Sequence, residues 1–139
     1  MAESSGALRV EVVSPEKVLF SGDATQVITR TIEGGEIAFL PGHAAFLGAL
    51  TQNHTRIYLA DGSIQNLAVH LGFVEVGPDH VTILSDSAEL EEDIDVARAR
   101  AAKARAEEQM RTEHSAEVEG DLRRAHARLA ATGGIEASH

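Results

Sequence analysis

The sequence predicts an antiparallel β-sandwich of about ten short strands followed by a C-terminal α-helical hairpin. Through Asp86, apolar residues alternate in short runs separated by glycine-containing turns, and from Ile94 onward alanine, arginine and glutamate dominate. Alternation with period two is typical of half-buried strands, whereas an alanine-rich stretch has high helix propensity. We therefore expect two small domains, a sandwich at 1–86 and a helical hairpin at 87–139.

The expected strands follow one another at short intervals, with turn residues between them. Ser21-Gly22-Asp23 is expected to turn the chain between the second and third strands, and Asp61-Gly62 and Gly77-Pro78-Asp79 each predict a hairpin. Between 41 and 50 we expect a loop that returns to the core through Ala44, Phe46 and Leu47. The predicted strands are 8–12, 18–20, 25–32, 37–40, 55–59, 64–71, 73–76 and 81–84.

Two helices are expected after the strands, at about 94–112 and 116–132. Asp93 is the predicted N-cap of the first, whose apolar face (Ile94, Ala97, Ala101 and Ala104) is small. The second has a narrow apolar stripe suited to one partner helix, and Gly133-Gly134 should end it before a short disordered tail. Such an alanine-lined seam gains little on burial, so this helical arm should be able to leave the sandwich. The stripe consists of Val118, Leu122, Ala125 and Leu129.

The charge of the chain disfavours several classes of partner. The 139 residues carry a net charge of −10, and acidic side chains exceed basic ones on both sides of Asp86. An acidic chain is a poor ligand for nucleic acid and is repelled by anionic lipid, so no direct lipid contact is expected. No apolar run is long enough to span a membrane, no secretory signal is recognisable at the start, and a cytoplasmic location is the default expectation.

The sequence offers little for catalysis. It lacks cysteine, the GxSxG and HExxH motifs and a phosphate-cradling glycine loop, and its seven histidines show no metal-ligand spacing on one helix. We expect no catalytic residue, no metal and no required cofactor. An acid–base pair of Glu36 and His43 is the remaining enzymatic hypothesis, and a loop that docks another protein is the favoured interpretation of the same residues.

Arginines on the first predicted helix indicate an anion site. Arg98 and Arg105 are seven residues apart, so their guanidinium groups share a face roughly 10 Å apart and could bracket a di- or triphosphate. Asp95 could orient an arginine or accept from an adenine amine, and arginines 123, 124 and 128 of the second helix could close over the anion. An ordinary solvated helix face is the alternative.

Four stretches together carry a resemblance to a known family: VVSPEKVLFSG (12–22), GEIAFLPGHAAFLGAL (35–50), GFVEVGPDHVTILSDSAE (72–89) and IDVARA (94–99). Along nearly its whole length the chain resembles the epsilon subunit of the F-type ATP synthase. The resemblance implies a non-catalytic central-stalk subunit that links the gamma subunit to the c-subunit ring during proton-driven ATP synthesis. It also implies a peripheral location on the cytoplasmic side of the cell membrane.

The resemblance also assigns roles to individual residues. The loop that faces the c ring corresponds to Glu36, Pro41, Gly42 and His43. The C-terminal helices permit ATP hydrolysis when folded against the sandwich, and restrain it when extended into the alpha/beta catalytic head.

Some family members bind regulatory ATP in the folded-down state through a motif that is intact here as Ile94, Asp95, Arg98 and Ala99. Further members of that pocket correspond by spacing to Glu89, Arg105 and Arg128, while Thr132 replaces an expected arginine. The alternative function is a stand-alone nucleotide-sensing module whose helical arm folds on ATP.

Overall fold

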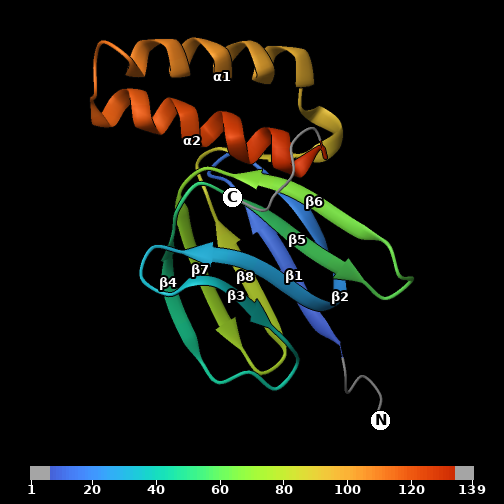
Figure 1. Ribbon diagram of the computed structural model, residues 1–139. Helices are drawn as coiled ribbons and strands as arrows, with labels where there is room; N and C mark the ends of the chain where they lie inside the picture. The colour runs from blue at the N-terminus through green and yellow to red at the C-terminus, as the bar shows by residue number, and fades with distance from the viewer. Residues whose placement is uncertain (1–6, 134–139) are drawn as a thin grey trace.

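The computed structural model describes residues 7–133 and consists of a β-sandwich with two helices lying across one end (Figure 1). The predicted fold class is confirmed, and the predicted disordered tail lies outside the described residues. Nine strands occur in the described part of the chain. The elements are β1 (Leu8–Val13), β2 (Val18–Thr31), β3 (Gly35–Phe39), β4 (Phe46–Leu50), β5 (Asn53–Leu59), β6 (Ile64–Val69), β7 (Gly72–Gly77), β8 (His80–Leu84), β9 (Ala88–Leu90), the 3-10 turn η1 (Glu91–Asp93), α1 (Val96–Met110) and α2 (Ala116–Ala131).

The strands enclose a single core. They pair in the order β1-β8-β7-β4-β2-β5-β6-β9, with a single pair of residues joining β4 to β2, while β3 joins β2 and β1 also pairs with β2. All of these pairs are antiparallel except β1 with β8. Alternate side chains of each strand point inward, so valine, leucine and isoleucine fill most of the core. Its largest fully buried side chains include Phe39, Leu8, Leu50, Ile57, Leu67 and Ile83.

The turn predicted at Ser21-Gly22-Asp23 is wrong, because β2 runs without interruption for 14 residues. These three residues pair in register with β1, with Gly22 opposite Val10. A Cβ at position 22 would lie 3.3 Å from Cζ of Phe20, so the glycine here leaves room for a neighbouring ring. A Ser-Gly-Asp triplet favours turns locally, but the ladder with β1 outweighs that preference.

The segment after the fourth predicted strand (37–40) forms β4, where the sequence predicted only a loop. Leu47 was expected in the core, yet it is 72 % exposed, and Ala44 is exposed as well. Leu47 lies opposite Glu75 of β7, on the outer face of the sheet. Phe46 is half-buried and packs against the core, as expected.

The N-cap of α1 is Asp95, and the prediction of Asp93 is wrong. Asp93 belongs to η1, and Ile94 after it is extended, so the helix begins two residues later than expected. The Asp95 carboxylate accepts a hydrogen bond from the Arg98 backbone N–H at 3.1 Å, which satisfies a donor that the helix start leaves free. Ser115 caps α2 in the same way through the backbone N–H of Val118.

The predicted apolar face of α1 is wrong, since Ala97, Ala101 and Ala104 are exposed. Ala99 and Ala106 are the buried residues of this helix. Because alanine occurs on every face of α1, its periodicity could not select the buried one. On α2 the predicted stripe is confirmed: Leu122 is half-buried, and the other three members, Val118, Ala125 and Leu129, are buried.

The arm rests on the sandwich through α2, which lies between α1 and strands β5 and β6 (Figure 1). A small cluster of Ala68, Ala127 and Ala131, with Ile94 packed beside it, forms the apolar part of this seam. At about 25 cal/mol per Å² of buried apolar surface, alanine side chains contribute only a few kcal/mol. The seam is therefore weak compared with the sandwich core.

Candidate nucleotide site

All five residues predicted for a nucleotide site line one cavity of about 490 Å³ between the arm and the sandwich. Glu89 comes from β9, Asp95, Arg98 and Arg105 from the start and middle of α1, and Arg128 from α2. A cavity of this size is within the usual range for small-molecule sites. Ala99 of the predicted motif also lines the cavity, whereas Ile94 packs in the seam beside α2, and the structure adds Asp93 and Ala102 to the lining.

Two arginines of this cavity are available for an anion. Within residues 7–133, the guanidinium groups of Arg98 and Arg105 have no carboxylate oxygen within 4.0 Å. Both side chains belong to exposed residues of α1 that border the cavity. Forked guanidinium donors on one helix face suit phosphate oxygens, so the cavity could hold a phosphate chain.

Asp95 is the N-cap of α1, and this structural role limits its part in ligand binding. Its Oδ1 already accepts the Arg98 backbone N–H, so the carboxylate fixes the start of α1 and orients the helix that carries both arginines. Ala102 lies between Arg98 and Arg105 on the same face and leaves space there. The helical spacing of positions 98, 102 and 105 could have identified Ala102 as a lining residue from the sequence. Asp93 was missed as a lining residue because it was predicted to be the N-cap of the helix.

Glu89 joins the sandwich to the arm. Its Oε1 accepts hydrogen bonds from Arg128 Nε at 2.6 Å and from His70 Nε2 at 2.8 Å. Partial burial raises the pKa of Glu89, but the bonds from His70 and Arg128 outweigh it, so the pKa lies below its ordinary value of 4.5. His70 was not predicted, since its contact with Glu89 depends on the pairing of β6 with β9.

Acid should therefore release the arm. The hydrogen bond and charge of Arg128 lower the pKa of Glu89 only while the arm is docked, so the docked state is stabilised when Glu89 is ionised and loses this stability as the pH falls through the docked pKa, below 4.5. The measurement is fluorescence energy transfer between one label on the arm and one on the sandwich, from pH 7 to pH 3. Circular dichroism of the β-sheet is recorded in parallel. Energy transfer should fall at a higher pH than the sheet signal, because the arm leaves before the sheet unfolds. Glu89→Gln should make arm release independent of pH in this range. Glu113→Gln, at an exposed site between the two helices, should leave the pH dependence of release unchanged. Equal pH dependence in the two variants would contradict the assignment of arm release to Glu89.

A smaller cavity of about 190 Å³ continues from the first, sharing Ala102, Arg105 and Arg128 and reaching Arg124. Arg124 is ion-paired with Asp121 on the same helix, and Arg123 pairs with Glu119. Of the three helix-two arginines considered from the sequence, the structure brings only Arg128 into the main cavity.

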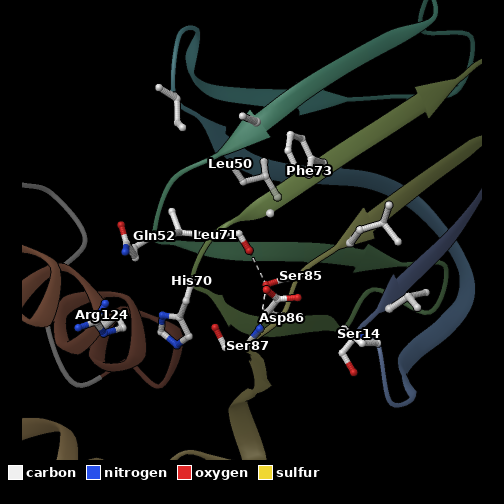
Figure 2. Close-up of a pocket in the computed structure, with 16 residues that line it drawn as sticks. Ser14, Leu50, Gln52, His70, Leu71, Phe73, Ser85, Asp86, Ser87 and Arg124 are labelled. Atoms are coloured by element: carbon white, nitrogen blue, oxygen red, sulfur yellow. Dashed lines mark hydrogen bonds between the residues drawn. The ribbon is translucent and has the colours of Figure 1, made fainter.

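Another cavity, of about 690 Å³, is a different kind of site. Figure 2 shows Leu50, Leu71 and Phe73 on its apolar side, with His70 and Arg124 on the side nearest α2. Its lining contains a single arginine, which is paired with Asp121. Phosphate binding is therefore better served by the cavity between Glu89 and Arg105.

The residues predicted to face the c ring lie in two places. Pro41, Gly42 and His43 form the β3–β4 loop, at the end of the sandwich away from the helices (Figure 1). Gly42 donates its N–H to Pro78 O at 2.7 Å, which ties this loop to the β7–β8 turn. His43 is half-buried, with its ring edge against Phe39 at 5.0 Å between centroids.

Glu36 is separate from that loop, near the start of β3. Its carboxylate is paired with Arg56 of β5 at 2.6 Å. A half-exposed pair of this kind contributes little to stability, and the guanidinium moderates the negative charge that Glu36 offers to a partner.

Two family models cover the described chain. The model for "ATP synthase, Delta/Epsilon chain, beta-sandwich domain" matches residues 7–91, and that for "ATP synthase, Delta/Epsilon chain, long alpha-helix domain" matches residues 92–133. In the described part of the chain, neither helix is long and apolar enough to cross a membrane.

Curated relatives named ATP synthase epsilon chain are similar over most of their length. The chain of Halalkalibacterium halodurans is 44 % identical over 132 residues, which is 91 % of this chain and 97 % of the relative. That of Moorella thermoacetica is 39 % identical over 133 residues, covering 93 % and 98 %. That of Alkalihalophilus pseudofirmus is 47 % identical over 103 residues, covering 74 % and 76 %.

Two solved structures share the fold at low sequence identity. A chain of the Euglena gracilis mitochondrial ATP synthase, in a structure of OSCP, F1 and the c-ring, aligns with a TM-score of 0.72 at 18 % identity, covering 96 % of this chain and 81 % of that one. A chain of the Tetrahymena thermophila mitochondrial ATP synthase, in a structure of the central stalk and c-ring, gives 0.54 at 14 % identity, covering 92 % and 96 %.

Proposed function

The chain belongs to the ATP synthase delta/epsilon chain family as an epsilon subunit of the F-type enzyme, and on that premise we propose that it is a rotor component of the central stalk. In this role it is a non-catalytic chain that links the gamma subunit to the c ring during proton-driven ATP synthesis. Its place is peripheral, on the cytoplasmic side of the cell membrane, where it is held by its partners.

An exposed apolar row across β8, β7 and β4 carries this proposal. Leu84 and Phe73 lie opposite each other, Ala49 continues the row, and the first two are 48 % and 55 % exposed. Leu71 and Leu47 extend the apolar surface at its margins, 53 % and 72 % exposed. Contiguous apolar surface of this kind marks a protein interface, and gamma is the partner that we assign to it.

Phe73→Asp is expected to weaken binding to gamma at least about tenfold, because a carboxylate in an apolar interface loses its hydration without gaining a partner. The measurement is the dissociation constant for purified gamma, with Ile64→Asp as the matched control. Ile64 is an exposed apolar residue on β6, 43 % exposed, away from the row. Equal affinity of the two variants would overturn this assignment of the surface.

The opposite end of the sandwich is proposed to rest on the c ring. The β3–β4 loop, with Pro41, Gly42 and His43, supports this because it protrudes away from the arm and is braced by Pro78. Glu36 contributes at the margin of the contact, where its pair with Arg56 can be exchanged for a pair with the ring. A single exposed pair of this kind is worth under about 1 kcal/mol.

The arm is proposed to restrain ATP hydrolysis by leaving the sandwich and extending into the alpha/beta head. The weak alanine seam supports this, since a two-state arm needs a gap of only a few kcal/mol. ATP in the cavity between Glu89 and Arg105 would favour the docked state, because its lining comes from both the sandwich and α1.

The same cavity favours a second candidate, a stand-alone nucleotide sensor whose arm folds on ATP. The two functions differ in their need for a partner. A rotor component binds gamma stably, whereas a free sensor has the same ATP affinity with or without gamma and does not co-elute with it.

A further inference from the structure

His70 is a buried polar residue that the proposed nucleotide cavity does not include. It follows β6 directly and is 3 % exposed. Continuing the alternation of β6, it shares a face with Ala68, which is opposite Glu89 in the register with β9 and packs against α2. The backbone thus sets His70 beside Glu89, the carboxylate of β9 that bonds to Arg128 of the arm.

The hydrogen bonds around Glu89 form a chain from the sandwich core to the arm. His70 Nε2 and Arg128 Nε both bond to Glu89 Oε1, at 2.8 and 2.6 Å. Because an ionised carboxylate only accepts, the His70 ring must donate from Nε2. Glu89 and Arg128 are each about one-third exposed, so His70 is the buried member of the chain.

The other nitrogen of the ring is informative. His70 Nδ1 is buried and has no hydrogen-bond partner among the described residues. A buried polar atom without a partner is destabilising, and a leucine could fill the same space without one. Packing alone therefore does not account for a histidine here, whereas the bond from Nε2 to Glu89 does.

We propose that His70 is a positioning residue that orients Glu89 to hold Arg128, and that His70, Glu89 and Arg128 form a clasp that keeps the arm docked without nucleotide. A glutamate on a three-residue strand has several accessible rotamers, and fixing one of them in advance lowers the entropic cost of capturing Arg128. The clasp rests on the proposal that the arm can undock, and it needs neither ATP nor gamma.

Arm position in the isolated full chain, free of nucleotide, tests the clasp. The sequence contains no cysteine, so Ala60→Cys and Ala104→Cys place labels at two exposed sites, one in the β5–β6 turn and one on α1. The distribution of distances between the two labels gives the ratio of molecules with an undocked arm to molecules with a docked arm. His70→Leu should raise this ratio at least about fivefold, because Glu89 loses its buried donor.

Two further variants separate positioning from packing. His70→Gln retains an N–H near the position of Nε2 and should stay within about twofold of the parent chain, whereas an effect equal to that of His70→Leu would overturn the proposal. In an Arg128→Gln background, His70→Leu should change the ratio less than about twofold, because the clasp is already broken. An undiminished effect there would also overturn it.

If the His70→Leu variant does not fold, His70→Asn takes its place, because the shorter asparagine side chain does not reach Glu89. His70→Asn is then compared with His70→Gln, and its effect is measured again in the Arg128→Gln background. Because neither ATP nor gamma is present, failure of the clasp leaves the rotor and nucleotide proposals to their own tests.

Discussion

A chain that ends after Asp93 is expected to join the ATP synthase and to raise ATP hydrolysis by the assembled complex several-fold. The truncation removes α1 and α2 but keeps all nine described strands, including β9, and the apolar row proposed for gamma. If the arm restrains rotation with a gap of about 1 kcal/mol, its loss corresponds to roughly a fivefold change. The measurement is ATP hydrolysis by purified complexes with matched epsilon content.

A second truncation, after Asp86, is the control for this experiment. It also removes β9, whose three residues pair with Leu67, Ala68 and Val69 of β6, and it uncovers part of the core at Ala88 and Leu90. The chain that ends after Asp86 should be less stable than the chain that ends after Asp93, and a smaller fraction of it should assemble into the complex, although both truncated chains lack the arm. Failure of the longer chain to bind gamma, or unchanged hydrolysis once it is bound, would refute the division of labour between sandwich and arm.

The part of the fold that was predictable from the sequence is the part that local patterns determine. Asp61-Gly62 and Gly77-Pro78-Asp79 turn the chain where expected, because a tight hairpin depends on the residues at its tip. The stripe on α2 was predictable because Val118, Leu122 and Leu129 are large apolar residues at helical spacing, although the buried Ala127 and Ala131 lie outside it. On α1, alanine on all faces removed that contrast.

Two of the errors occur where distant pairing decides. Ser21-Gly22-Asp23 has the composition of a turn, and only the ladder with β1 shows that it continues a strand. The same applies to β4, whose pairing with β7 turns Leu47 outward. Asp93 and Asp95 are both acceptable caps by residue type, and the extended backbone at Ile94 decides between them.

The residues of the candidate site likewise fall into those that local spacing predicted and those that depend on distant pairing. Spacing on one helix related Arg98 to Arg105, and Arg128 was one of three arginines of the second helix that could close over the anion. Glu89, 39 positions from Arg128, was linked to them only through a family resemblance. The cavity now places all of these residues around one space. His70 had no signal in the sequence, since its role depends on the register between β6 and β9.

Arg98→Ala is expected to abolish most of the affinity of the isolated chain for ATP. A charge-assisted hydrogen bond to phosphate is worth about 1.5–3 kcal/mol, which corresponds to roughly 10- to 150-fold in the dissociation constant. The substitution leaves the helix start intact, because Asp95 accepts the backbone N–H of residue 98 and not its guanidinium. Asp95→Ala would remove the cap as well as any contact with nucleotide, so Arg98 is the cleaner position.

Calorimetric titration with ATP measures this effect, and Arg100→Ala is the matched control. Arg100 is an exposed arginine on the same helix, outside the cavity lining. Micromolar binding that survives in Arg100→Ala and is lost in Arg98→Ala would establish an ATP-stabilised arm. If the unsubstituted chain takes up no ATP at millimolar concentration, Arg98 and Arg105 form a solvated helix face. The position of the arm is then set by its seam with the sandwich, by gamma and by the catalytic head.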